Sequence, residues 1–97
     1  MTRKERHAGD PVRIPIEDSI DLHTFSPKEI PSLLEEYLRE CVKARIYEVR
    51  IIHGKGRGYQ RRMVHSFLEK SSLVQSFQSA PPTFGGWGAT IAVLRRE

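Results

Sequence analysis

Two histidines in this sequence stand beside residues that could support acid–base chemistry on a phosphate. His23 follows Asp21 by two residues, so a β-strand would place both side chains on one face. An imidazole with a pKa of about 6.5 can act as acid or base near neutral pH, and a neighbouring carboxylate can orient it. The same pattern also fits a solvated polar strand end. His53 is the second candidate, because a glycine-rich basic segment follows it directly.

Residues 51–58, which read Ile-Ile-His-Gly-Lys-Gly-Arg-Gly, predict a turn that binds an anion. The glycines allow positive φ and let the backbone approach a ligand closely. Amides exposed at the turn and at the start of the following helix favour a phosphate, and the basic side chains add positive charge. The expected phosphate contacts in this segment are Gly54, Lys55, Gly56, Arg57 and Gly58. A tight strand-to-helix turn with solvated charges is the alternative interpretation.

Nucleotide-binding loops fit this segment poorly. Tyr59 stands where a dinucleotide-binding loop requires glycine, and the Gly-Lys-Ser/Thr of a P-loop is absent. The pattern therefore indicates contact with a phosphate backbone rather than a nucleotide pocket.

Basic residues gather in the second half of the 97-residue chain. Residues 1–49 carry eight Lys or Arg against ten Asp or Glu, whereas residues 50–97 carry eight against two. Five basic residues lie between Arg50 and Arg62 with no acid among them. This asymmetry predicts a basic face that binds DNA or RNA, with a solvated charged face as the alternative.

Cysteine content and hydropathy indicate the compartment. The single cysteine, Cys41, excludes an internal disulfide and is typical of a reducing environment. No apolar run reaches membrane-spanning length, and the first residues lack the apolar core of a signal peptide. We therefore expect a cytoplasmic monomer with no membrane contact. Residues 1–13 predict a flexible basic tail, and residues 14–97 predict one domain.

Hydrophobic periodicity predicts the element order β-α-β-α-β-β of an α/β domain. The expected strands cover residues 19–23, 49–52, 74–77 and 89–94. The first helix should begin at Ser26, where Glu29 completes a capping box, and Pro31 should distort or delay its first turn. A second helix is expected over residues 60–69, with His65 on its solvated flank.

The predicted connections bring the candidate residues toward one edge of the sheet. The first two strands should be parallel, because a helix joins them, so their carboxyl ends should meet. Asp21 and His23 end the first strand, and His53 ends the second. Sites in open α/β sheets form in the crevice outside such ends. We therefore expect the acid, both histidines and the basic segment to converge.

Three segments together resemble the Smr domains, the small MutS-related domains. Residues 20–23, Ile-Asp-Leu-His, look like the Leu-Asp-x-His signature of the family, and residues 53–56 match its His-Gly-x-Gly motif. Residues 85–90, Gly-Gly-Trp-Gly-Ala-Thr, resemble the glycine-rich segment before its last strand. The resemblance covers roughly residues 14–95. It points to the standalone bacterial type, with Arg45 in place of a usual glycine.

The resemblance implies a fold and an activity. The implied fold is an α+β sandwich, a mixed four-stranded sheet with two helices, similar to the C-terminal domain of translation initiation factor 3. The implied function is nucleic-acid binding, with endonuclease activity that nicks DNA or cleaves RNA. A non-catalytic DNA- or RNA-binding module and a ribosome-associated adaptor are the alternatives.

The resemblance also suggests residue roles. His23 is the expected general acid or base, with Asp21 as its orienting carboxylate and His53 as a further catalytic residue. Arg61 corresponds to the basic residue that the family carries early in the second helix, and both Arg61 and the following Arg62 are expected to bind the phosphate of a nucleic acid. No cofactor is firmly implied. A weak Mg²⁺ or Mn²⁺ contact at Asp21 stays open, because one carboxylate and two imidazoles make a thin site for a hard cation.

Overall fold

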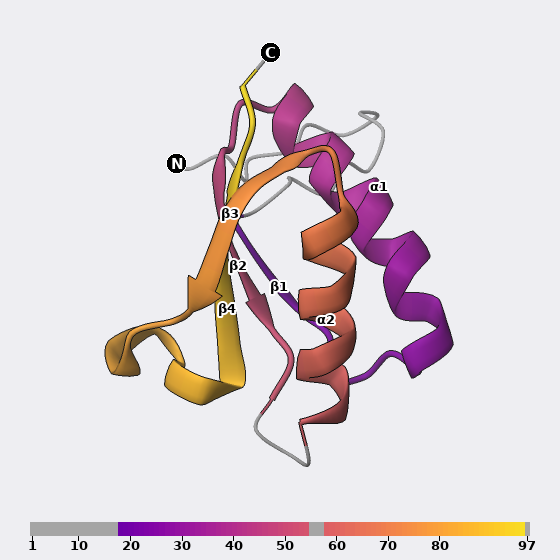
Figure 1. Cartoon of the computed structure of the whole chain (residues 1–97), viewed down its shortest axis with the longest axis vertical. Helices are drawn as coiled ribbons and strands as arrows, with labels where there is room; N and C mark the ends of the chain where they lie inside the picture. Colours follow the sequence, from indigo (N-terminus) through magenta and orange to yellow (C-terminus); the bar gives the residue numbers. More distant parts are fainter. Residues whose placement is uncertain (1–17, 55–57, 97) are drawn as a thin grey trace, which may run out of the picture.

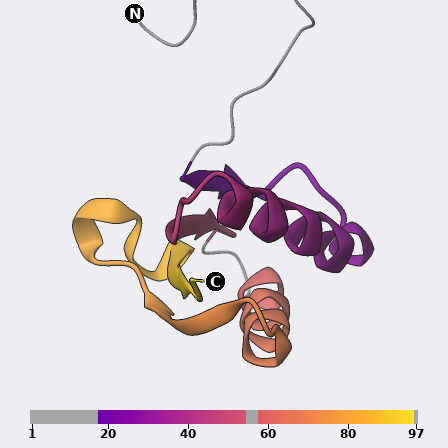
Figure 2. The same ribbon diagram turned by 90° about the horizontal axis from the view of Figure 1, so that it is seen from above.

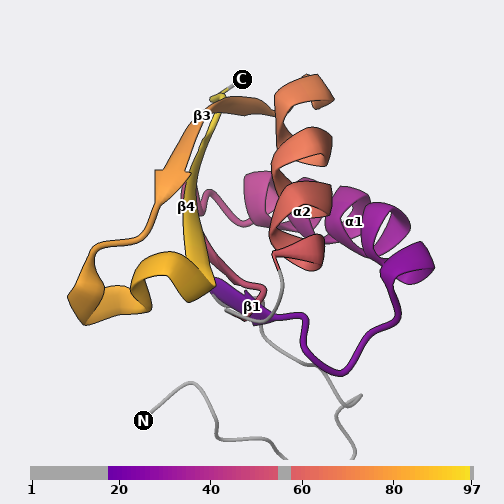
Figure 3. The same ribbon diagram turned by 60° about the horizontal axis from the view of Figure 1, so that its bottom comes forward.

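The chain forms a four-stranded mixed sheet with two helices packed on one face (Figures 1 and 3). The computed structural model describes residues 18–54 and 58–96. The strands are β1 (Ser19–Asp21), β2 (Glu48–Ile52), β3 (Val74–Ser79) and β4 (Ala89–Leu94), and the helices are α1 (Ile30–Lys43) and α2 (Tyr59–Lys70). The described residues also form short 3₁₀ helices, which are η1 (Pro27–Glu29), η2 (Pro82–Phe84) and η3 (Gly86–Gly88). The predicted fold class is confirmed, whereas the predicted tail over residues 1–13 lies outside the described residues.

The strand order is β1-β2-β4-β3. β1 is parallel to β2, as a helical crossover requires, and β4 is antiparallel to both β2 and β3. The carboxyl ends of β1 and β2 therefore lie at the same end of the molecule as the start of α2, at the bottom of Figure 1. We call this end the motif edge.

β1 is shorter than the predicted strand over residues 19–23. The last bond of its ladder runs from the Leu22 N–H to the Ile52 carbonyl at 2.8 Å. Alternate residues of a strand bond to the same neighbour, so the His23 N–H points away from β2, and it donates to Asp21 Oδ1 at 3.0 Å. The aspartate side chain thus turns the chain immediately after the strand.

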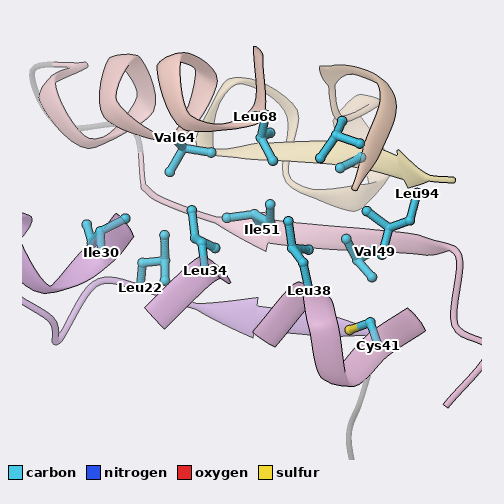
Figure 4. Packing of buried hydrophobic residues seen from close by; sticks show 12 residues of the cluster. Leu22, Ile30, Leu34, Leu38, Cys41, Val49, Ile51, Val64, Leu68 and Leu94 are labelled. Carbon is cyan, nitrogen blue, oxygen red and sulfur yellow. The ribbon is translucent and has the colours of Figure 1, made fainter. Parts of the chain in front are cut away.

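The helices cover the sheet through one hydrophobic cluster (Figure 4). From α1 it takes one apolar stripe, with Ile30, Leu34, Leu38 and Cys41 fully buried. From the sheet and α2 it takes Val49, Ile51, Ala92, Leu94, Val64 and Leu68. Burying one such aliphatic side chain contributes about 1.5–3 kcal/mol, so this packing fixes β1, β2, β4 and α2 relative to one another.

The start of α1 agrees with its sequence signals. Ser26 donates its backbone N–H to Glu29 Oε1 at 3.0 Å, which is the reciprocal bond of the capping box. The first turn is a 3₁₀ turn, and the regular helix begins at Ile30, one residue before Pro31. The proline therefore lies in the first turn of the α-helix, where a missing N–H costs little.

The end of α1 is closed by a residue in the left-handed conformation. Arg45 has φ +62°, the conformation for which glycine is usually selected at this position. The Ile46 N–H reaches back to the Cys41 carbonyl at 2.8 Å, and the Arg45 N–H bonds to the Val42 carbonyl at 3.0 Å. This bonding pattern is a Schellman motif, and it directs the chain into β2.

Candidate functional site

Asp21 and His23 form an exposed hydrogen-bonded pair just after β1. His23 Nδ1 lies 2.7 Å from Asp21 Oδ1, and the two side chains are 70% and 50% exposed. The hydrogen bonds that Asp21 accepts from the backbone and then from the ring of His23 lower the pKa of its carboxyl group. An ionised carboxylate only accepts, so Nδ1 carries a proton and Nε2 of a neutral His23 is free to accept one. The pair has the chemistry of a general base held by a carboxylate.

His53 lies in a different environment, on the helix-facing side of the sheet. Its side chain is 4% exposed, and its Nε2 atom is 2.9 Å from Thr90 Oγ1 at the start of β4. The same hydroxyl is 2.7 Å from His65 Nε2 on α2. The His53 and His65 rings meet edge to face with centroids 6.1 Å apart. Thr90 thus links the end of β2 and the start of β4 to the middle of α2.

The proton positions in this group follow from its partners. His53 Nδ1 lies 3.1 Å from the Gly54 carbonyl, which can only accept, so Nδ1 carries the proton. Burial lowers the pKa of His53, the bond to Gly54 opposes this, and the charge of Arg61 adds to the lowering. A neutral His53 accepts at Nε2 from the Thr90 hydroxyl. Thr90 in turn accepts from His65 Nε2–H.

The prediction that the two histidines converge is therefore wrong. Asp21 is the register partner of Ile52, and its side chain lies on the face away from the helices. His53 comes one residue after Ile52 and points to the opposite face, where both of its ring nitrogens contact protein groups. Among residues 18–54 and 58–96, no hydrogen bond or ion pair joins His53 to the Asp21–His23 pair. The strand ends meet as predicted, but the side chains form two separate groups.

The prediction that His65 lies on the solvated flank of its helix is also wrong. Burial, Arg61 and His53 lower its pKa, in that order of importance, and its ring packs against Phe77 with centroids 5.0 Å apart. The sequence contains one signal that could have indicated this role. His65 follows Arg61 by four residues, so the two share one helix face, and Arg61 is a predicted site residue.

The glycine segment has the predicted backbone conformation where the structure describes it. Gly54 has φ +86° and Gly58 has φ +80°, both in the region that favours glycine. The predicted contacts Lys55, Gly56 and Arg57 lie outside the described residues. The N–H groups of His53 and Gly54 both donate to the Gly88 carbonyl, at 3.0 and 2.9 Å. The two family-like glycine motifs are thus joined through the backbone.

The start of α2 suits an anion. Gly58 provides no side-chain cap, and the first turn contains no acidic residue. In the described part of the chain no side chain caps this turn, and the N–H groups at a helix start together with the positive end of the helix dipole favour a negatively charged group. Arg62 lies beside this turn, since its Nη1 atom would be 3.6 Å from a Cβ atom on Gly58.

Arg61 connects α2 to the loop between β3 and β4. Its guanidinium carbon lies 3.8 Å from the centroid of the Trp87 ring, and its Nη2 atom donates to Ser79 Oγ at 3.1 Å. Arg61 Nε is buried without a hydrogen-bond partner in the described part of the chain. Arg50 contacts the same loop from the sheet, through a 3.3 Å bond to the Phe84 carbonyl. Neither Trp87 nor Ser79 belongs to the predicted site.

Basic residues also line a hollow at the other end of the domain, where α1 and β4 end (Figure 1). A hollow of about 890 Å³ there is lined by Arg39, Val42, Lys43, Arg45, Tyr47, Leu73 and Arg96. Arg39 and Lys43 pair with Glu35 and Glu40 on the helix surface. The predicted basic face is thus one of two basic regions.

The donor atoms at the motif edge do not make a holding site for a metal. Asp21 and His23 supply one carboxylate and one imidazole, and Asp21 Oδ1 already accepts two bonds from His23. Within residues 18–54 and 58–96, no group of three or more His, Cys, Asp or Glu side chains is placed to bind an ion. A resident hard cation needs more oxygen ligands than this pair supplies.

Comparison with known proteins identifies the family. Residues 20–95 match the family model of the Smr domain. The chain belongs to the Smr domain family. The Smr domain of Thermus thermophilus MutS2 has a similar structure, with a TM-score of 0.77 and 32% identity over 81% of this chain and 99% of that domain. YdaL, a stand-alone small MutS-related protein from Escherichia coli, has a TM-score of 0.72 and 28% identity over 84% of this chain and 67% of YdaL.

Curated relatives of this Smr domain include larger proteins. Endonuclease MutS2 of Thermomicrobium roseum is 38% identical over 79 residues, which cover 81% of this chain and 10% of that protein. Endonuclease MutS2 of Lactococcus lactis is 32% identical over 92 residues, which cover 95% of this chain and 12% of that protein. The Smr domain described here therefore spans about a tenth of the length of these relatives. In its described residues, neither helix has the length and apolar character of a membrane span.

Proposed function

We propose that this Smr domain binds nucleic acid at the motif edge and acts there as an endonuclease that nicks DNA or cleaves RNA. The exposed Asp21–His23 pair carries this proposal, because it leaves one imidazole nitrogen free and held in a defined orientation. The names of the MutS2 relatives, which are endonucleases, support the same reaction class.

His23 would supply the proton transfer in phosphodiester cleavage. In the proposed step, Nε2 accepts the proton of the attacking oxygen, which is water for DNA or the 2′-hydroxyl for RNA. The new P–O bond forms as the bond from phosphorus to the leaving oxygen breaks. The leaving oxygen takes up a proton from water, and the imidazolium of His23 afterwards returns its proton to the solvent. Asp21 keeps the proton of His23 on Nδ1 and stabilises the imidazolium that forms.

The phosphate would be held by groups around the start of α2. The uncapped first turn offers backbone N–H groups, and Arg61 and Arg62 supply positive charge. Lys55 and Arg57 extend this charge by their place in the sequence. His53 has a positioning role in this scheme, because its ring contacts Gly54 and Thr90 rather than solvent. No step of this scheme is assigned to a metal, because the Asp21–His23 pair supplies only one carboxylate and one imidazole.

Cleavage assays with matched variants test this proposal. Supercoiled plasmid and single-stranded RNA are incubated with the parent, His23→Ala and Asp21→Asn, each with and without EDTA. We expect His23→Ala to lose roughly 10²–10⁴-fold in cleavage rate while it keeps its fold and most of its affinity. Asp21→Asn should also lose activity, because the asparagine keeps the shape of the aspartate but lacks the negative charge that orients the His23 ring.

The same assays distinguish the alternatives. An unchanged rate in folded His23→Ala would remove His23 from the mechanism. Binding without cleavage by the parent on every substrate would favour the non-catalytic module or the ribosome-associated adaptor. Loss of parental activity in EDTA would assign the reaction to a weakly bound divalent ion such as Mg²⁺ or Mn²⁺.

A further inference from the structure

The large apolar side chains that the described residues expose are all aromatic and all come from the segments that form the motif edge. Tyr59 is 54% exposed, Phe84 is 55% exposed and Trp87 is 54% exposed. Tyr59 is the first residue of α2, Phe84 closes η2, and Trp87 is the central residue of η3. The loop that carries η2 and η3 projects from the side of the sheet away from the helices (Figure 2). Single exposed apolar side chains are ordinary on a protein surface, so the groups around each ring decide whether it can bind a ligand.

Trp87 differs from the other two because a cation supports its ring. The Arg61 guanidinium lies 3.8 Å from the ring centroid and is itself held by the bond to Ser79 Oγ. The neighbouring Gly88 is buried, and its carbonyl accepts from both His53 and Gly54. The ring is therefore attached to the rigid part of the domain, although more than half of its side chain is accessible. A flat group that binds it would need little further ordering of the protein.

We propose that Trp87, supported by Arg61, is a stacking platform for an unpaired nucleobase. This inference rests on the proposed function and specifies its ligand as single-stranded or locally unpaired DNA or RNA. Every base offers an aromatic face, but in a continuous duplex those faces are covered by neighbouring base pairs. A base stacked on Trp87 would bring its phosphates beside the Arg61 charge and the uncapped start of α2. A protein ligand would bind less strongly than a nucleic acid to a surface that combines an aromatic ring with a guanidinium group and backbone N–H groups.

The composition of the chain provides a direct probe of this contact. Trp87 is the single tryptophan, so all tryptophan emission reports on this ring. The parent is titrated with a single strand of about 12 nucleotides, a length within the range of single-strand binding sites. A fully abasic strand of equal length and a blunt duplex serve as comparison ligands. The anisotropy of an end label measures binding, and tryptophan emission of unlabelled mixtures measures stacking.

We expect the single strand to bind and to quench the emission. The abasic strand should bind about tenfold more weakly and cause no quenching, since it keeps the phosphates but lacks the bases. The duplex should also bind more weakly than the single strand. Trp87→Leu should lose about tenfold in affinity for the single strand and little for the abasic strand. Phe84→Leu is the matched control, because it removes an equally exposed aromatic ring from the same loop, and it should bind like the parent.

The failure of this inference and the failure of the proposed function give different results. Tight binding of the single strand with unchanged emission, or with unchanged affinity in Trp87→Leu, would overturn the platform and leave nucleic-acid binding intact. Preference for the duplex would overturn it as well. An equal loss in Trp87→Leu and Phe84→Leu would replace the platform by a general apolar contact. Absence of binding to all three ligands would overturn both the platform and the proposed function, and would leave a protein partner as the explanation for the exposed rings.

Discussion

The Nε2 atom of His53 lies 2.9 Å from the Oγ1 atom of Thr90, which joins the end of β2 to the start of β4 inside the protein. Because Thr90 also accepts from His65, its hydroxyl group satisfies the buried imidazole of His53 and the half-buried imidazole of His65. Thr90→Val keeps the shape but removes this hydroxyl. We expect the free energy of unfolding to fall by about 1–3 kcal/mol, the cost of leaving buried polar groups unpaired. Urea denaturation measures the change.

Thr90→Ser is the control for that substitution. It keeps the hydroxyl group and loses only a methyl group, so it should cost about 1 kcal/mol and less than Thr90→Val. Equal stability of Thr90→Val and the parent would show that the His53–Thr90–His65 group does not stabilise the fold.

The buried His53 and the half-buried His65 should make stability depend on pH. Burial, as the largest cause, lowers the pKa of both His53 and His65 below the ordinary imidazole value. The unfolded chain therefore binds protons more readily, and acidification favours unfolding. The free energy of unfolding should be constant above the unfolded pKa of about 6.5 and should fall as the pH drops below it.

Urea denaturation between pH 5 and 8 measures this effect. In a His53→Gln/His65→Gln double variant the two groups cannot titrate, so its stability should change less over the same range. A parent whose stability does not fall below pH 6.5 would contradict the neutral, hydrogen-bonded state of these rings.

Arg61 should contribute to nucleic-acid binding through its place in the structure and not only through its charge. Arg61→Ala removes a cation that lies at the start of α2 and over Trp87. Arg96→Ala removes a matched cation, which lies 4.3 Å from the centroid of Tyr47 at the opposite end of the molecule. We expect Arg61→Ala to weaken binding and to reduce the log–log salt slope by roughly 0.7–0.9, the loss of one phosphate contact. Titrations at several salt concentrations test both variants, and equal losses would indicate a diffuse charge effect.

Gly85 and Gly86 both have positive φ, but they should differ in how well they tolerate substitution by alanine. Gly85 has φ +112°, and a Cβ atom there would lie 2.8 Å from Ala89 Cβ. Gly86 has φ +54°, and a Cβ atom there would meet nothing within 4 Å. Gly86→Ala should cost about 1 kcal/mol, the cost of an ordinary left-handed residue, whereas Gly85→Ala should cost about 3 kcal/mol or more. Thermal and urea denaturation compare the pair, and equal stability of the two variants would contradict the assigned loop conformation.

Arg45 should be replaceable by glycine with a gain in stability. Its φ of +62° costs a non-glycine residue about 1 kcal/mol of stability. Glycine removes this strain, but it also makes the unfolded chain more flexible, which offsets part of the gain. Arg45→Gly should therefore raise the free energy of unfolding by about 0.5–1 kcal/mol. Arg45→Ala removes the same charge but keeps the Cβ atom, so it should give no such gain. If both variants were stabilised equally, the charge and not the backbone would be responsible.

The amino-acid sequence by itself determined the elements of the fold and their order. The apolar stripe of α1, the capping box at Ser26 and the β-branched run before His53 are local patterns, because each depends on residues within a few positions. The positive φ of Gly54 and Gly58 and the pairing of Asp21 with His23 are equally local, and the structure has them as the residue types suggest. Topology rules then place the ends of β1 and β2 at one edge.

Only the tertiary structure decided which side chains meet at that edge. The register of β1 against β2 pairs Asp21 with Ile52, and this one-residue offset sends His53 to the opposite face. His53 and His65 lie 37 and 25 positions before Thr90 in the sequence, so no local pattern links either histidine to that hydroxyl group. Arg61 and Trp87 likewise meet because α2 packs beside the end of β3. Contacts of this kind depend on how whole elements pack, and the sequence pattern of each element alone does not contain that information.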